Sequence, residues 1–161
     1  MKASKPKSML KHAPQGKRVK PTLGYSDVLT VKLDFDDKSL KTVKYWAKRV
    51  CKFFKLDGFL ILRSSSDSYH VVFNRSVSWS RNVHIMNWAA LMIEGRRLKN
   101  LPLTKYALMQ DIKESSCLRI GKKKVEGKKE KPSPRTVFKF GKQNNEIKNY
   151  LQFKRNLRRF L

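Results

Sequence analysis

Three of this chain's few acidic residues crowd into four positions, Asp34, Asp36 and Asp37, at the end of an apolar run. The chain has 38 lysines and arginines against 12 aspartates and glutamates. Asp34 and Asp36 stand two residues apart, and on a strand such residues point to the same face. Two carboxylates so placed repel each other unless a cation neutralises them. Because carboxylate oxygens suit Mg²⁺ or Mn²⁺, which position phosphates for nucleotidyl transfer, the pair predicts a divalent metal site.

The same acids also fit a structural role. They directly precede a predicted helix, where Asp37 can accept hydrogen bonds from backbone N–H groups as an N-terminal cap. Negative charge is also favourable at the positive end of a helix, and Lys38 is a nearby partner. The spacing alone leaves both interpretations open.

The elements that must position these acids follow from the pattern of apolar residues. Residues 29–35 alternate between apolar and polar, which predicts a half-buried strand. Residues 38–55 have apolar side chains at steps of three and four, with lysines on another face, which predicts an amphipathic helix. Further elements are expected in order along the chain: two strands within 59–74 joined by a turn at 65–68, a helix within 76–98 capped by Ser78 or Ser80, strands within 115–121 and 135–141, and a helix over 145–161.

This order predicts an α+β fold of the split β-α-β, ferredoxin-like or RRM-like type. Both main helices would then cover one face of an antiparallel sheet and leave the other face open. On the strand that contains residues 69–73, Tyr69 and Phe73 share one face and His70 lies on the other. If the aromatic residues pack on the helices, His70 joins Asp34 on the open face. Arg63, at the end of the preceding strand, is a further candidate for this face.

Charge divides the chain into three parts: a basic arm over 1–26 expected to be disordered or ordered by RNA or DNA, a core over 27–141 with a lysine-rich loop at 122–134, and a basic C-terminal helix over 142–161. The net charge of +26 favours a polyanionic partner, and we expect nucleic acid, DNA or RNA. The candidate phosphate contacts are Lys17, Arg18, Lys20, Arg63, Ser68, Arg119, Lys122, Lys123, Lys124, Arg135, Arg158 and Arg159.

Membrane association is not expected, because the sequence contains no run of 18 apolar residues. Its two cysteines stand singly, without the spacing of a zinc site, which favours reduced thiols. We therefore expect a cytoplasmic protein, associated with the nucleoid or with ribosomes.

Two short motifs carry a resemblance to a known family. Asp-Phe-Asp at 34–36 and Ser-Tyr-His at 68–70 resemble the Asp-x-Asp and Ser-x-His motifs of the archaeo-eukaryotic primase superfamily. The stretch around the second motif is similar to small primase–polymerase proteins of archaeal mobile elements. The resemblance spans residues 28–140 and also implies an RRM-like core.

The resemblance implies DNA-templated synthesis from nucleoside triphosphates. Asp34 and Asp36 would hold Mg²⁺ or Mn²⁺, and His70 would contact the phosphates of the incoming nucleotide, with Ser68 nearby. The family's third motif is an apolar residue followed by aspartate on a later strand. Asp111 is the candidate catalytic residue for that position, although Gln110 precedes it, and Glu114 is the fallback.

Two functions therefore remain open. One is a primase- or polymerase-type nucleotidyltransferase with a nucleic-acid-binding surface. The other is a non-catalytic architectural or ribosome-associated protein, which explains the long basic extensions better. In the second case the acids at Asp34 and Asp36 are structural and no metal is needed.

Overall fold

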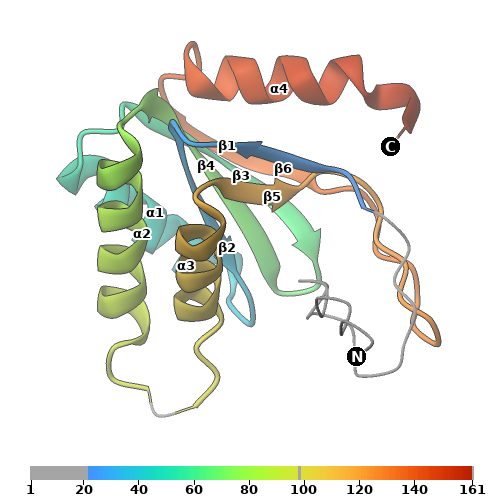
Figure 1. Ribbon diagram of the computed structural model, residues 1–161, viewed down its shortest axis with the longest axis horizontal. Helices are drawn as coiled ribbons and strands as arrows, with labels where there is room; N and C mark the ends of the chain where they lie inside the picture. Colours follow the sequence, from blue (N-terminus) through green and yellow to red (C-terminus); the bar gives the residue numbers. More distant parts are fainter. Residues whose placement is uncertain (1–21, 98, 161) are drawn as a thin grey trace, which may run out of the picture.

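The computed structural model describes residues 22–97 and 99–160 (Figure 1). In these residues the fold is α+β, as predicted, with two antiparallel sheets and four α-helices. The larger sheet has the strand order β2-β4-β3-β6. Its strands are β2 (Thr30–Phe35), β3 (Gly58–Ser65), β4 (Ser68–Ser76) and β6 (Arg135–Gly141). The smaller sheet pairs β1 (Gly24–Asp27) with β5 (Ser116–Arg119).

Two capped helices follow the predicted strands. In α1 (Leu40–Phe53), the Ser39 hydroxyl accepts a hydrogen bond from the Thr42 N–H. In α2 (Trp79–Glu94), the Ser78 hydroxyl accepts from the Arg81 N–H, which confirms one of the two predicted caps. Each hydroxyl satisfies an N–H that has no partner within the helix.

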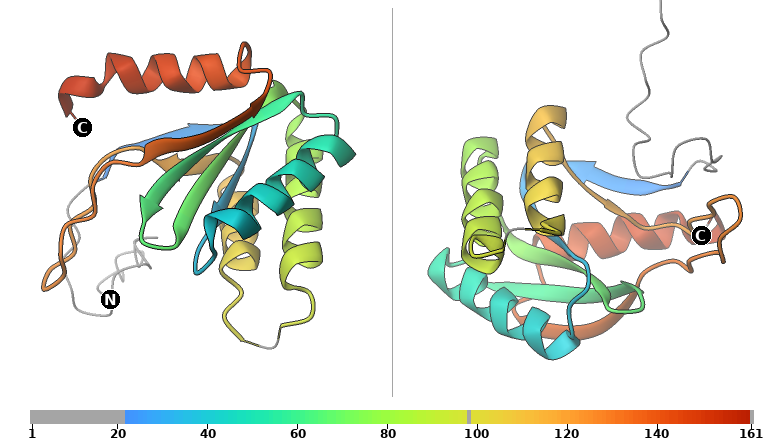
Figure 2. Two further views of the ribbon diagram at one scale, coloured as in Figure 1. Left: turned by 180° about the vertical axis from the view of Figure 1, so that it is seen from behind. Right: turned by 90° about the horizontal axis from the view of Figure 1, so that it is seen from below.

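The apolar face of β2 packs toward these helices. Val31, Leu33 and Phe35 are fully buried in one core with Tyr69 and Phe73 of β4. Buried residues of α1 and α2 complete this core. The alternation of apolar and polar residues over 29–35 therefore correctly predicted which face of β2 packs against the helices. Helices α1 and α2 lie on one side of the larger sheet and α4 (Glu146–Asn156) lies on the other (Figure 2).

The second face of the sheet is covered, so the prediction of an open face is wrong. Leu60 and Leu62 of β3 and Val72 of β4 form a second core with β5 and α4. The sequence contained this signal, because β3 and β4 are apolar at consecutive positions, and strands buried on both faces read as continuous apolar runs. The predicted fourth core strand also differs, since β5 pairs with β1 and β6 takes the edge beside β3.

Lys32 fastens the smaller sheet to the larger one. Its side chain is fully buried, and Nζ lies 3.1 Å from Asp27 Oδ1 and 2.9 Å from Ser116 Oγ. The same ammonium lies 4.9 Å from the centroid of the Tyr25 ring. A buried lysine needs such partners because desolvation of its charge is expensive.

Helix α3 (Pro102–Lys113) was not predicted from the sequence. Its cap comes from another helix: the Glu94 carboxylate accepts hydrogen bonds from the N–H groups of Leu103 and Thr104, at 2.7 and 2.9 Å. Leu103 and Ala107 pack into the helix-side core. The sequence carries one local signal for this start, Pro102 in the first turn, but no Ser, Thr, Asp or Asn cap precedes it, and the helix was not anticipated.

The boundaries of the terminal segments shift slightly. Strand β1 begins inside the segment 1–26 predicted as an arm, and residues 1–21 of that segment lie outside the described residues. After α4, a short 3₁₀ turn, η1 (Arg158–Phe160), follows. Over the ranges that the structure covers, no helix has the length and apolar character needed to cross a membrane.

Candidate functional site

Asp34 on β2 and His70 on β4 face each other across neighbouring antiparallel strands. His70 Nε2 and Asp34 Oδ1 are 3.6 Å apart. This register confirms the prediction that the two side chains share one face of the sheet. The Asp34 side chain is 31% exposed and that of His70 is 5% exposed. Solvent therefore reaches the pair from the aspartate side.

The environment of Asp34 disfavours its charged form. Burial by surrounding atoms, and secondly the like charge of Asp36, raise the pKa of Asp34 from 3.8 to about 7. Arg119, Lys123 and Lys131 act in the opposite direction and do not overcome these effects. Asp34 therefore gives up its proton at a higher pH than a free aspartate does.

His70 is held neutral. Burial, followed by the positive charges of Arg119 and Lys154, lowers the pKa of His70 from 6.5 to about 3. Its Nδ1 atom is buried and has no hydrogen-bond partner among the described atoms. The resemblance implied that His70 contacts nucleotide phosphates, but the residue is 4% exposed and lies beneath the surface.

Arg119 joins three segments next to this pair. Its guanidinium donates hydrogen bonds to the backbone carbonyls of Gly121, Pro132 and Ser64. Carbonyls satisfy these donors without neutralising the charge. The positive charge of Arg119 therefore still acts on Asp34 and His70. Its hydrogen bonds to Pro132 and Ser64 also connect the lysine-rich loop to the end of β3.

The lysine-rich loop brings two further cations to the acids. Lys123 and Lys131 pair through their backbones, with N···O distances of 2.9 and 2.8 Å. Burial, Lys131 and Arg119 lower the pKa of Lys123, while Asp34 and Asp36 oppose this effect. The loop therefore places Lys123 and Lys131 near Asp34 and Asp36.

An open, polar pocket of about 430 Å³ lies beside Asp36. It forms where the β3–β4 turn, the start of α3 and the lysine-rich loop meet. The polar side chains that line it are Asp36, Asp37, Ser65, Ser66, Ser68, Asn100, Lys105 and Lys131. Ser68 thus lines the same pocket as Asp36 and Asp37, and two lysines face these two carboxylates across it.

Asp36 lines this pocket and Asp34 does not, so the two carboxylates could supply ligands to at most one divalent ion. Mg²⁺ commonly takes one or two protein carboxylates and completes its shell with water and substrate phosphates, which Asp34 and Asp36 can provide for. Within the described ranges no group of three or more His, Cys, Asp or Glu side chains is placed to hold a metal. The strand expected to carry Asp111 is instead α3, where Asp111 is exposed, and Glu114 is an exposed residue at the C-cap of that helix.

Arg63 does not join His70. Its guanidinium donates a hydrogen bond to the Tyr69 hydroxyl at 2.9 Å and lies 5.5 Å from the ring centroid. Tyr69 belongs to the helix-side core, so Arg63 projects on the opposite side of the sheet from His70. The reason is alternation, since Arg63 follows Ile61 on the same face. Arg135 lies opposite Arg63 in the register of β3 and β6.

The other predicted phosphate contacts lie away from the pocket. Lys122 and Lys124 are exposed in the lysine-rich loop, and Arg158 and Arg159 are exposed in η1. Lys17, Arg18 and Lys20 lie outside the described residues.

Sequence reasoning missed the pocket residues Asn100, Lys105 and Lys131. Lys131 belongs to the loop that was singled out for its charge, and only its position in the fold distinguishes it from its neighbours. Asn100 and Lys105 gave no signal because α3 was not predicted.

The chain matches no protein-family model, no curated protein and no solved structure in the three comparisons made. The resemblance to the archaeo-eukaryotic primase superfamily therefore rests on the motifs at 34–36 and 68–70 alone and stays a prediction.

Proposed function

We propose that this protein binds nucleic acid through contacts to the phosphodiester backbone. The observation that carries the proposal is that several of its few acids are turned inward and used by internal partners. Asp27 contacts Lys32, Glu94 caps α3, Glu146 accepts from the Thr30 hydroxyl at 2.7 Å, and Asp34 faces His70.

The surface keeps the strongly basic character of the composition, 38 basic against 12 acidic residues. Glu94 and Glu146 are buried, Asp27 is offset by the buried Lys32, and Asp34 stays partly exposed. A surface of this kind attracts a polyanion, and release of the counterions condensed on nucleic acid drives the association.

The finer proposal is that the corner formed by Asp34 and Asp36 binds a nucleotide with a divalent ion. A carboxylate whose pKa is raised to about 7 is unfavourable for stability, and such groups cluster at functional sites. Asp34 and Asp36 would hold Mg²⁺ or Mn²⁺, while Lys105 and Lys131 would bind phosphates. The ion would neutralise phosphate charge during nucleotidyl transfer. The β2-α1-β3-β4-α2 order also supports a relation to RRM-like primase cores.

A non-catalytic role is the second candidate. Two observations favour it: among the described residues no third His, Cys, Asp or Glu is placed to share a metal ion with Asp34 and Asp36, and His70 is buried rather than presented to a nucleotide. In this case the protein is an architectural or ribosome-associated nucleic-acid-binding protein.

One experiment separates the two candidates. Purified protein is incubated with Mg²⁺ or Mn²⁺, labelled nucleoside triphosphates and primed or unprimed DNA templates. The finer proposal predicts incorporation that is lost in the Asp34→Asn plus Asp36→Asn variant. Asp111→Asn serves as a matched control, because that exposed carboxylate lies on α3. Absence of incorporation by the wild type, with nucleic-acid binding intact, leaves the non-catalytic role.

A further inference from the structure

A row of lysines runs along one side of α1. Lys41, Lys44, Lys48 and Lys52 recur at steps of three and four residues, so they lie on one side of the helix. At 1.5 Å per residue this row is about 16 Å long. No acidic residue occurs between residues 38 and 56.

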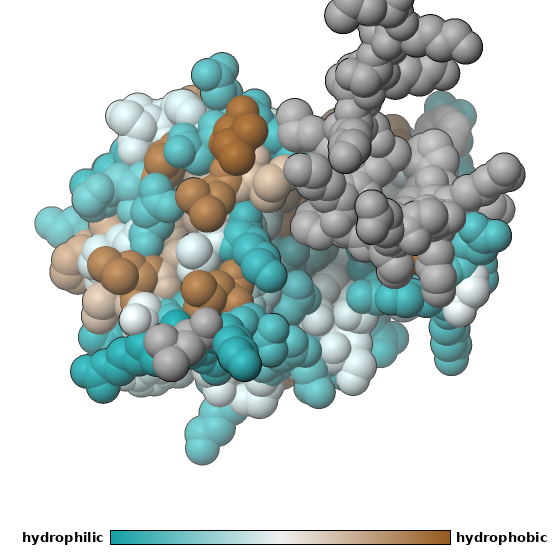
Figure 3. Space-filling model, turned by 60° about the horizontal axis from the view of Figure 1, so that its bottom comes forward, coloured by the Kyte–Doolittle hydropathy of each residue, from teal (hydrophilic) through white to brown (hydrophobic). Residues whose placement is uncertain are grey.

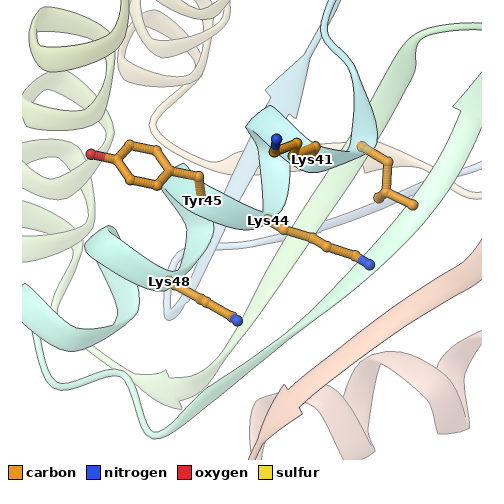
Figure 4. A pocket seen from close by; sticks show the side chains of 5 residues that line it. Lys41, Lys44, Tyr45 and Lys48 are labelled. Carbon is orange, nitrogen blue, oxygen red and sulfur yellow. The ribbon is translucent and has the colours of Figure 1, made fainter.

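Aromatic rings of β6 hold two of these lysines in place. Lys44 Nζ lies 4.2 Å from the centroid of the Phe138 ring, and Lys48 Nζ lies 5.4 Å from that of Phe140. Both side chains extend from the same side of α1 (Figure 4). Cation–π contacts of this kind restrict the lysine side chains, so less conformational entropy is lost when they bind a ligand.

The row is electrostatically unfavourable by itself. Like charges at i, i+4, as in Lys44–Lys48 and Lys48–Lys52, destabilise a helix by a few tenths of a kcal/mol per pair. Helices that need charge only for solubility usually alternate its sign. Here no glutamate or aspartate is interspersed. The repulsion is relieved when an extended polyanion lies along the row.

An open hollow of about 410 Å³ accompanies the row, lined by Leu40, Lys41, Lys44, Tyr45 and Lys48. It gives a ligand a place to lie against the helix. The hollow is on the helix side of the larger sheet, whereas Asp34 projects from the other face. The two features are therefore separate sites.

We propose that α1 and β6 form a second nucleic-acid contact surface, which binds the phosphodiester backbone through Lys41, Lys44 and Lys48. This inference rests on the proposed nucleic-acid binding, and it specifies where one strand of the bound nucleic acid contacts the protein. Phe138 and Phe140 are covered by the lysines, so they position cations instead of stacking on bases. The surface therefore binds without sequence preference.

The test compares two variants of the full chain that lose the same charge. The first is Lys41→Gln, Lys44→Gln and Lys48→Gln, and the control is Arg96→Gln, Lys99→Gln and Lys113→Gln, three exposed cations near the ends of α2 and α3. Affinity is measured for labelled 20-nucleotide DNA, 20-nucleotide RNA and 20-base-pair DNA over a range of salt concentrations.

Loss of three phosphate contacts should reduce the slope of log affinity against log salt concentration by about 2 to 3 in magnitude. It should also reduce the affinity about tenfold or more. The control variant should lose clearly less affinity for nucleic acid. Equal losses in the two variants overturn the inference and leave nucleic-acid binding intact, because net charge alone then explains them. If the wild type binds none of the three probes, the proposed function fails as well.

A measurement on the wild type makes the test independent of how the variants fold. Bound nucleic acid should protect Lys44 and Lys48 from chemical acetylation, while Lys99 and Lys113 stay reactive. Phe138→Leu, which changes no charge, should weaken binding about threefold if the ring orders Lys44. Absence of protection at Lys44 and Lys48 contradicts the inference.

Discussion

Asp34 and His70 lie 3.6 Å apart, and their surroundings move their pKa values in opposite directions. The pKa of the aspartate is raised to about 7 and that of the histidine is lowered to about 3. Burial is the main cause in both cases, because it disfavours the charged form of either group. The pair is therefore close to neutral over a range in which free side chains would attract each other as ions.

The first prediction concerns stability against pH without divalent ions. Between pH 3.8 and 6.5 the folded state holds the Asp34 proton more tightly than the unfolded state, so this group makes stability fall as pH rises. His70 has the opposite effect, because the unfolded state binds its proton more tightly. In the wild type the opposite effects of Asp34 and His70 on the pH dependence of the unfolding free energy should largely cancel.

Single substitutions should expose the two slopes. The measurement is urea unfolding in EDTA between pH 3.8 and 6.5. The unfolding free energy of Asp34→Asn should increase as pH rises, and that of His70→Gln should decrease. Each slope should be on the order of 1 kcal/mol per pH unit. If both variants keep the pH dependence of the wild type, the assigned shifts are wrong.

The second prediction concerns metal binding. A divalent ion requires the deprotonated carboxylate, so Mn²⁺ should raise the melting temperature more at pH 8 than at pH 6. At a concentration tenfold above Kd the stabilisation is about 1.4 kcal/mol. The effect should vanish in Asp34→Asn and persist in Asp111→Asn. The same shift in both variants would indicate non-specific binding.

The third prediction concerns Lys32, which joins the two sheets. Lys32→Met leaves Ser116 and Asp27 without their cationic partner and should lower the free energy of unfolding by about 2 kcal/mol. Adding Asp27→Asn should recover part of the loss. Lys148→Met, at an exposed position of α4, serves as the control and should have little effect. Similar losses at both lysines would contradict a buried, paired Lys32.

The fourth prediction concerns the cap of α3. Glu94→Ala removes the acceptor for the Leu103 and Thr104 N–H groups and should lower stability by about 1 to 2 kcal/mol. Glu130→Ala, at an exposed position of the lysine-rich loop, should stay within about 0.5 kcal/mol of the wild type. Thermal or urea unfolding measures both. Equal changes in the free energy of unfolding of the two variants would mean that the Glu94 cap does not stabilise the fold.

The local pattern of the sequence predicted the elements that depend on local signals. Alternation located β2 and placed His70 on the face of Asp34, and the serine at 78 marked the start of α2. Tertiary contacts decided the rest. The Glu94 carboxylate that caps α3 belongs to the preceding helix, and Ser116, which accepts from Lys32, lies 84 residues further along the chain, so their pairing depends on the tertiary fold.

The candidate site was predicted only in part for the same reason. Asp34, Asp36 and Ser68 could be found because short motifs carry them. Lys105 and Lys131 come from segments whose placement depends on α3 and on the Arg119 contacts. Leu91 of α2 and Leu108 and Ile112 of α3 are exposed, and Figure 3 shows several apolar patches among the hydrophilic side chains of the face that it draws.

The salt dependence of nucleic-acid binding by the wild-type chain tests the central claim most directly. If about eight phosphates are neutralised, affinity for DNA or RNA should fall by three or more decades between 50 and 200 mM salt. A flat response, or no binding to either polymer at 50 mM salt, would contradict the account.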